Sequence, residues 1–320
     1  MTTVFPVIAY AQPAYVPPPP PIDPGWTPLQ IKLYGWDGSE WDLTNYEGGV
    51  FLMPGVRGLG SLEHEDHADD YASIAGAYYR DYRGLTREVY LPLYLYHDGS
   101  SIEWMQLDEA FWDVMSAGML NRLEVTRPDG SKRNLWIRYA KGGEDEFSID
   151  PTMFGWAKYG VYANAHQPYW EGETIEKPFQ VVSSGPTSFF GAGDVGGPPF
   201  YLQSPLATAG ATIDNPGKVE AWPVWTLTGQ LTSCQLKVGS STITVPFALS
   251  ETDVLVIDTR PTVQTAILNG TTDVTGLLSS FGFAPIPRGL ARPISIVPAA
   301  DPDTTAVVTC SLTALYERAV

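Results

Sequence analysis

The sequence of 320 residues has little cysteine and few basic residues. Cys234 and Cys310 are its only cysteines, so at most one disulfide is possible, and the pair fits a chain that folds in a reducing cytoplasm. We expect both to be half-buried thiols. Lys and Arg total 19 against 36 Asp and Glu, which gives a formal net charge of -17 and argues against a site that grips nucleic-acid phosphates.

The sequence also lacks an apolar run long enough to span a bilayer. The short apolar segment 7–11 lies between two prolines and follows no basic region, so it does not indicate a secretion signal. Catalytic motifs are missing as well: there is no Gly-x-Ser-x-Gly elbow, and the glycines of 55–60 are not spaced to cradle a phosphate. We interpret 55–60 as a turn between strands.

Two groups of polar residues remain as candidates for chemistry. The cluster His64–Asp70 would bind a divalent ion only if it were helical, because the two histidines three residues apart would then share a face; a solvated acidic loop is the interpretation that we favour. Glycosidases use two carboxylates as acid and base, and Asp37 with Glu40, or Glu144 with Glu146, could form such a pair. Pairs of this kind arise by chance in an acidic chain. We therefore predict a protein that is not an enzyme, with no catalytic, cofactor-binding or metal-binding residues and no cofactor.

Glycine and proline are abundant and aromatic residues are frequent. The sequence has 31 Gly, 28 Pro, 10 Trp and 17 Tyr, which favours short strands and many turns over long helices. Residues 1–25 contain the proline run 17–21, which imposes extended polyproline geometry, so we predict an N-terminal arm and not a domain.

Residues 26–175 predict a small twisted sheet with one helix. The strongest strand is Arg87–Tyr96, which places Val and Leu on one face and Tyr on the other, and we expect both faces to be covered. Helical spacing of apolar residues predicts a helix over Leu107–Met119, and a hairpin pairs Arg122–Thr126 with Asn134–Tyr139. Shorter strands are predicted over Leu29–Leu33, Trp41–Leu43 and Val50–Met53. This combination indicates an α+β domain.

Residues 176–320 predict an antiparallel β-sandwich without a helix. We place the boundary near the start of the Gly-, Ser- and Pro-rich segment 171–210, which includes Gly191–Pro199, and expect the rest of it to enter the second sheet irregularly. Strands are then predicted at short intervals over Ala221–Leu227, Cys234–Val238, Thr242–Phe247, Val254–Ile257, Val263–Leu268, Pro293–Val297 and Ala306–Leu315.

Motifs in both halves resemble those of siphophage distal tail proteins. In the first half, residues 123–130 followed by 133–139 are similar to the hairpin after the helix of that family's belt domain, and 156–159 with 165–170 resemble its closing strand. In the second half, the motifs similar to its galectin-like domain are Asn215-Pro216-Gly217, Trp222-Pro223, Ile257-Asp258-Thr259 and Pro287-Arg288-Gly289. The order and spacing of all these motifs are most similar to minor tail proteins of phages that infect actinobacteria.

The resemblance implies a belt domain over 26–175 and a galectin-like sandwich over 176–320. It implies that six belt domains close into a hexameric ring below the tail tube, with the sandwiches projecting outward. The chain would then be a virion protein, assembled in the host cytoplasm, that joins the tube to the tail-tip, tape-measure and receptor-binding proteins around an axial channel for DNA. No membrane or specific nucleic-acid partner is implied.

Two other functions stay open from the residues alone. Exposed aromatic rings stack on sugars, so a carbohydrate-binding module or an accessory subunit of a cell-wall hydrolase would use Trp222 and Trp225 on the sandwich face. A metal-dependent enzyme would be built around His64 and His67.

Overall fold

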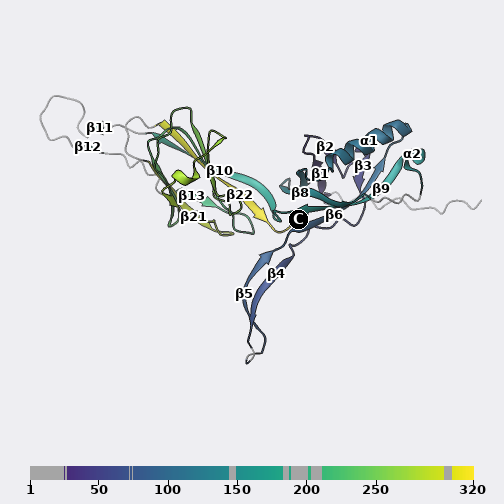
Figure 1. The fold of residues 1–320 in the computed structure, drawn as a ribbon, viewed down its shortest axis with the longest axis horizontal. Helices are drawn as coiled ribbons and strands as arrows, with labels where there is room; N and C mark the ends of the chain where they lie inside the picture. Colours follow the sequence, from purple (N-terminus) through teal and green to yellow (C-terminus); the bar gives the residue numbers. More distant parts are fainter. Residues whose placement is uncertain are drawn as a thin grey trace, which may run out of the picture.

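The structure is a computed structural model of the chain. It describes residues 25, 27–71, 73, 75–143, 149–182, 187–188, 201–202, 211–298 and 305–320. The predicted arm, apart from Gly25, and the segment Gly191–Pro199 lie outside the described residues. The fold is mainly β with antiparallel sheets, as predicted, and two hydrophobic cores divide it into a barrel module (residues 27–170) and a sandwich module (residues 179–312). Figure 1 shows the two modules side by side.

The barrel module is a strongly curved antiparallel sheet. Its strands lie in the order β2, β1, β7, β8, β9, β6, β3. The backbone N–H of Leu52, at the end of β3, donates to the carbonyl of Leu43, just after β2, at 2.8 Å, so the two edges of the sheet come together and nearly close it. The strands are β1 (Gln30–Tyr34), β2 (Glu40–Asp42), β3 (Val50–Leu52), β6 (Arg87–Tyr96), β7 (Asn121–Thr126), β8 (Lys132–Gly142) and β9 (Trp156–Ala165).

One helix, α1 (Ser101–Val114), packs its apolar side on this sheet (Figure 1). The prediction of Leu107–Met119 placed the right helix but set it too late in the chain. Ser100 and Glu103 form a capping box that starts the helix six residues earlier, and the Trp104 side chain in its first turn is buried. A second short helix, α2 (Pro151–Phe154), and the 3₁₀ turn η1 (Tyr46–Gly48) complete the module.

The strand β6 has the predicted bounds, but its two faces differ in burial. Val89, Leu91, Leu93 and Leu95 are fully buried in the barrel core, whereas Tyr96 on the other face is 42% exposed and Tyr90 and Tyr94 are half-buried. The expectation that both faces are covered is therefore wrong for the single chain. An aromatic face of the sheet is left partly open to solvent.

The two modules are joined by a ribbon of two long strands. β10 (Trp170–Val182) leaves the barrel and pairs with β22 (Thr305–Tyr316), which returns to it. The pairing runs from Trp170 opposite Tyr316 to Val182 opposite Thr305, with one shift of register between Glu171 and Thr174. Glu171 of β10 also pairs with Asn134 of β8, so one continuous sheet runs through both modules. The prediction of an irregular segment after Glu171 is wrong as far as Val182, and the predicted boundary at 175 and 176 falls inside β10.

The sandwich module consists of two antiparallel sheets around one core. One sheet orders its strands β19, β18, β17, β14, β22, β10, and the other β13, β21, β15, β16, β20. Apart from the β10–β22 ribbon, the strands are β13 (Ala211–Asp214), β14 (Val224–Gln230), β15 (Cys234–Val238), β16 (Ser241–Val245), β17 (Val254–Asp258), β18 (Thr265–Leu268), β19 (Thr272–Asp273), β20 (Ser280–Phe281) and β21 (Ala291–Pro298). The described residues also include the short pair β11 (Thr187–Ser188) and β12 (Tyr201–Leu202), and the 3₁₀ turn η2 (Thr275–Leu277).

Candidate assembly surfaces

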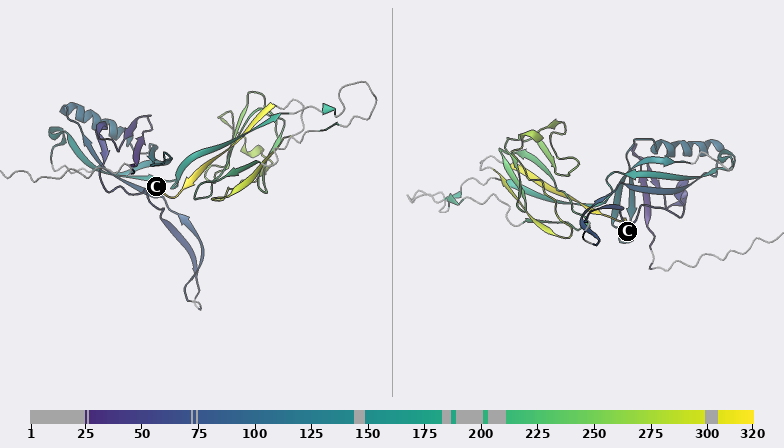
Figure 2. Two further views of the ribbon diagram at one scale, coloured as in Figure 1. Left: turned by 180° about the vertical axis from the view of Figure 1, so that it is seen from behind. Right: turned by 60° about the horizontal axis from the view of Figure 1, so that its bottom comes forward.

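A two-stranded hairpin stands clear of both modules. Its strands are β4 (His64–Asp70) and β5 (Ala77–Gly84), which pair from His64 opposite Gly84 to Asp70 opposite Ala77. The hairpin, which we call the arm from here on and which is distinct from the N-terminal arm predicted for residues 1–25, leaves the molecule where the modules meet and projects away from them (Figure 1 and the left view of Figure 2). The expectation that 64–70 is a solvated acidic loop is wrong, because these residues form the strand β4.

The arm has aromatic side chains but no core of its own. Nearly all of its residues are exposed, and ion pairs such as Arg80 with Asp69 at 2.6 Å and Arg83 with Glu65 at 3.1 Å lie on its surface. Four tyrosines in or beside the arm are 46–60% exposed, namely Tyr71, Tyr78, Tyr79 and Tyr82. An isolated hairpin is only marginally stable in water, and surface ion pairs add little. The arm is therefore the kind of element that a partner surface stabilises.

The base of the arm is held by a buried arginine. Arg87 is 4% exposed, and its guanidinium donates to the carbonyls of Pro168 at 2.7 Å, Gly58 at 2.7 Å, Gly60 at 2.8 Å and Glu317 at 2.5 Å. Burial lowers the pKa of this guanidinium from its usual value. We call this set of bonds the Arg87 clamp, and it ties together the segment before the arm, the turn into β10 and the segment after β22.

The Asn-Pro-Gly motif of the second half fixes a loop onto the end of β22. The Asn215 side chain accepts from the N–H of Gly217 at 2.9 Å and donates to the carbonyls of Val219 and Ile286, both at 2.9 Å. A side chain at Gly217 would meet the carbonyl oxygen of Leu315 at 2.7 Å, so only glycine permits this close approach.

The other motifs of the second half converge on the same loop. The Gly289 N–H donates to the carbonyl of Asn215 at 2.9 Å, and the Thr259 hydroxyl donates to the carbonyl of Pro223 at 2.6 Å. Asn215 and Thr259 are buried. These residues therefore build the scaffold of the sandwich, and their polar groups satisfy the backbone.

The candidates for metal or acid–base chemistry that lie within the described residues are not gathered into a site. His64 and His67 lie on a strand, where residues three apart point to opposite faces, so the shared helical face does not form. Asp37 accepts from Ser39, which lowers the pKa of its carboxyl, and Glu40 pairs with Lys32 at 2.5 Å. Glu144 and Glu146 lie outside the described residues, and within the described part no three His, Cys, Asp or Glu side chains come together as metal ligands do.

The sugar-stacking candidates and the cysteines are largely enclosed by the sandwich core. Trp225 is fully buried, so it offers no face to a sugar, and Trp222 is half-buried. Cys234 and Cys310 are free thiols, and both are buried instead of half-buried. Burial raises the pKa of each thiol to about 12. Among the described helices, none is long and apolar enough to cross a membrane.

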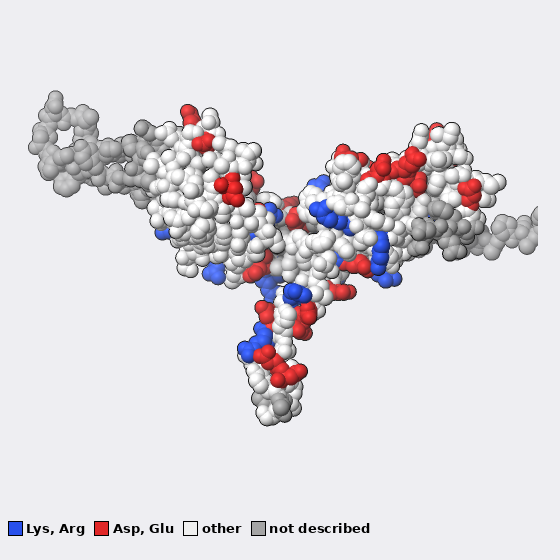
Figure 3. Space-filling view, in the orientation of Figure 1, with Lys and Arg blue, Asp and Glu red and all other residues white. Residues whose placement is uncertain are grey.

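Charge is unevenly distributed over the surface. Acidic side chains gather on the side of the barrel module where α1 lies, and basic ones lie around the junction of the modules (Figure 3). The acidic residues of α1 are Glu103, Asp108, Glu109 and Asp113. At the junction a pocket of about 270 Å³ is lined by Arg127, Arg133, Lys218, Tyr316 and Arg318, among others.

The sequence interpretation missed both the arm and the Arg87 clamp. The arm had a detectable signal, because three tyrosines and two arginines follow Gly76 within Ala77–Gly84, a composition typical of a strand. The clamp had none, since its four acceptors are backbone carbonyls that any sequence supplies.

The described architecture is therefore a nearly closed barrel with one long and one short helix, joined by a strand ribbon to a β-sandwich and carrying a projecting arm. This is the fold of phage tail-hub proteins of known structure. The crystal structure of SPP1 Dit (gp 19.1), described as a paradigm of the hub adsorption apparatus in phages infecting Gram-positive bacteria, matches with a TM-score of 0.58 and 12% identity over 90% of this chain and 99% of that chain.

A second match is a chain of the phage P2 baseplate in its activated conformation with Ca. It has a TM-score of 0.52 and 14% identity over 89% of this chain and 98% of that chain. The corresponding baseplate structure with Sr matches with a TM-score of 0.52 and 13% identity. No family model and no curated protein matches the sequence. At these identities the similarity shows a shared fold, and it extends over nearly the whole of each chain.

Proposed function

We propose that this chain is a structural protein of a phage tail, forming the hub that connects the tail tube to the tail tip and its receptor-binding machinery. The observation that carries the proposal is the fold shared with SPP1 Dit from end to end, over 90% of this chain and 99% of that one. Both modules, and not one common domain type alone, are included in the match.

The proposal extends to a ring of identical copies. The arm is an exposed hairpin with tyrosines on its surface, and the tyrosine face of β6 is partly open, so the single chain leaves apolar surface that a neighbouring copy would cover. We infer a homo-oligomer, six-fold by resemblance to the distal tail family, with the belt domain at 26–175 in the ring and the galectin-like domain at 176–320 outside it.

The remaining parts of the proposal concern the surroundings of the ring. Its neighbours are the tail tube protein, the tail-tip protein and, in contact with either, the tape-measure and receptor-binding proteins, in a particle assembled in the host cytoplasm. The motifs of the sequence favour a phage of actinobacteria. The excess of acidic residues, 36 against 19 basic ones, suits an axial channel through which DNA passes without binding. We propose no catalytic role.

The decisive test is whether the polypeptide is part of the virus particle. Mass spectrometry of gradient-purified virions detects the chain at a few copies per particle, and immunogold labelling places it at the end of the tail. Its absence from purified virions, or turnover of a substrate by the purified protein, would contradict the proposal.

The ring is tested by changing the arm. Replacing Tyr78, Tyr79 and Tyr82 together by Ser keeps the hairpin but removes its apolar surface, so we expect tail-end incorporation to be lost while the melting temperature of the chain stays within about 2 °C. The control is Phe281→Ser, which removes an exposed aromatic side chain on β20 of the sandwich module, outside the proposed ring. Equal incorporation of the triple variant and the control would show that the arm does not join copies.

A further inference from the structure

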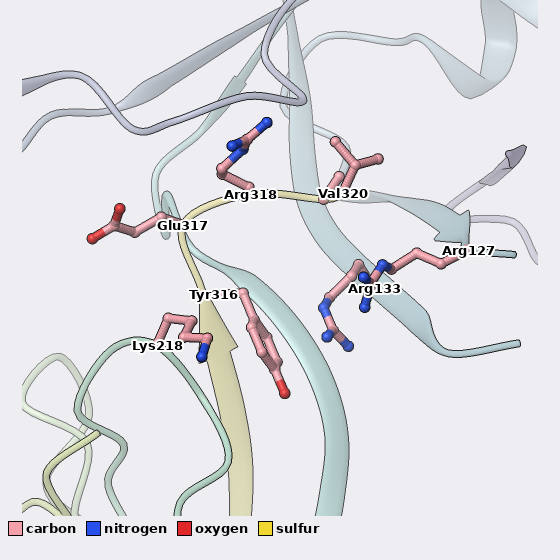
Figure 4. A pocket seen from close by; sticks show the side chains of 8 residues that line it. Arg127, Arg133, Lys218, Tyr316, Glu317, Arg318 and Val320 are labelled. Atoms are coloured by element: carbon pink, nitrogen blue, oxygen red, sulfur yellow. The ribbon is translucent and has the colours of Figure 1, made fainter. Parts of the chain in front are cut away.

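Basic side chains gather at the junction of the two modules, and among the described residues Arg127 pairs with Asp129 whereas Arg133 and Lys218 form no ion pair. The pocket of about 270 Å³ lies between the β7–β8 hairpin, which supplies Arg127 and Arg133, and the loop after β13, which supplies Lys218. In Figure 4 the Arg133 side chain lies beside the Tyr316 ring, Arg127 approaches the same space, and Lys218 lies across the ring from Arg133. The side chains of Glu317 and Arg318 point away from this space.

Arg133 is a buried cation whose charge is not balanced by an adjacent carboxylate. It is 7% exposed, its guanidinium carbon lies 3.5 Å from the centre of the Tyr316 ring, and its only hydrogen bond among the described residues goes to the carbonyl of Lys132 at 3.0 Å. The carboxylates of Asp129 and Glu173 raise the pKa of this guanidinium, but neither lies within ion-pair distance of it. A guanidinium has five N–H donors, and a buried charge is costly unless it is paired, so most of the binding capacity of Arg133 is unused.

The neighbouring cations strengthen the local positive potential. Arg127 lies just beyond the end of β7 and meets only Asp129, at 3.4 Å, and Ser131, at 3.2 Å. Lys218 forms no ion pair with any described residue. Burial first, and then the charge of Arg127, lower the pKa of the Arg133 guanidinium, while Tyr316, Asp129 and Glu173 act in the opposite direction.

The backbone leaves room for this arrangement. A side chain at Gly172 on β10 would meet the Tyr316 ring at 2.7 Å and the Arg133 guanidinium at 3.1 Å. The Arg133–Tyr316 stack is therefore pressed against the β10–β22 ribbon, which holds the guanidinium in place before any ligand arrives.

We propose that this junction pocket is an oxyanion-binding site, in which the guanidinium of Arg133 binds two oxygens of a carboxylate or phosphate group and Arg127 and Lys218 add charge from either side. Planar guanidinium groups bind such oxygens in pairs, and the volume of the pocket suits one anionic group with its stem. This site goes beyond the tail-hub role and does not depend on it.

Occupation of the site has a structural consequence. Arg127 and Arg133 belong to the barrel module, while Lys218 belongs to a loop of the sandwich module. An anion bound by all three bridges the modules and stabilises their junction. The anion has two sources, a free inorganic ion or a carboxylate side chain presented by an acidic protein segment.

The test measures anion binding by the full-length protein with isothermal titration calorimetry. Inorganic phosphate is one ligand and a hexaglutamate peptide is the other, both at constant ionic strength set with chloride. We expect saturable binding of at least one of them and at least a tenfold weaker affinity in Arg133→Met. Tighter binding of the peptide assigns the site to an acidic protein segment, and tighter binding of phosphate assigns it to a free ion.

A second variant covers the case in which Arg133→Met does not fold. Arg127→Gln removes a half-buried guanidinium at the rim of the pocket, and we expect a three- to tenfold loss of affinity. The matched control is Arg292→Gln, which removes an exposed guanidinium on β21 and leaves the affinity unchanged. The proposal is wrong if neither ligand binds the wild-type protein, or if Arg127→Gln and Arg292→Gln bind the ligand with equal affinity.

Discussion

Replacing Arg87 by Met should destabilise the barrel module far more than replacement of an ordinary surface arginine. Four backbone carbonyls lose their donor, and methionine keeps most of the packing of the stem. If each buried carbonyl left without a donor costs about 1 kcal/mol, the free energy of unfolding falls by about 4 kcal/mol. For a module of this size the melting temperature then falls by roughly 8–16 °C.

The measurement is chemical denaturation followed by tryptophan fluorescence, which reports chiefly on the barrel module because only Trp222 and Trp225 lie in the sandwich. Arg87→Lys should be intermediate, since an ammonium is a point donor and cannot reach acceptors on several sides. The control is Arg122→Met, which loses a cation–π contact with Tyr34 at 4.2 Å that is worth about 0.5–1 kcal/mol. A loss below about 1 kcal/mol in Arg87→Met would refute the clamp.

Two further predictions concern the sandwich module. Gly217→Ala should destabilise it by about 2–3 kcal/mol, because the new methyl group meets backbone atoms of Leu315. The control Gly276→Ala, whose methyl group meets no other atom, should leave the melting temperature unchanged in a thermal-melting assay of both variants. Equal melting temperatures of the two variants would contradict the role of the Asn-Pro-Gly loop. Burial raises the pKa of Cys234 and Cys310 to about 12, so only ~10⁻⁴ of each thiol is ionised at pH 8. Neither thiol should react with a disulfide reagent in the native protein, and both should react after unfolding in guanidinium chloride. Stoichiometric labelling of the native protein would show that the thiols are accessible.

Strands with a buried face could be predicted from the sequence because burial leaves an alternating pattern. β6 was predicted with its bounds, and the β7–β8 hairpin was predicted from its Pro-Asp-Gly turn and alternating residues. The arm leaves no such pattern, since both of its faces meet solvent and its residues are polar or aromatic on either side.

The remaining errors have physical causes of their own. The start of α1 is set by the capping pair Ser100 and Glu103, which outweighs the apolar spacing further along the helix. β10 continues past Glu171 because β22, more than a hundred residues later in the chain, pairs with it. The junction pocket brings together Arg133 and Lys218, which are far apart in the sequence, so no local pattern indicates it.

The β10–β22 ribbon determines how the molecule responds to mechanical load. Because β10 and β22 each run from one module to the other, a force that pulls the modules apart is shared by two covalent backbones in parallel, and the hydrogen bonds between the strands keep them side by side under that load. Tension on the sandwich module is thus transmitted to the barrel module as through a stiff tether.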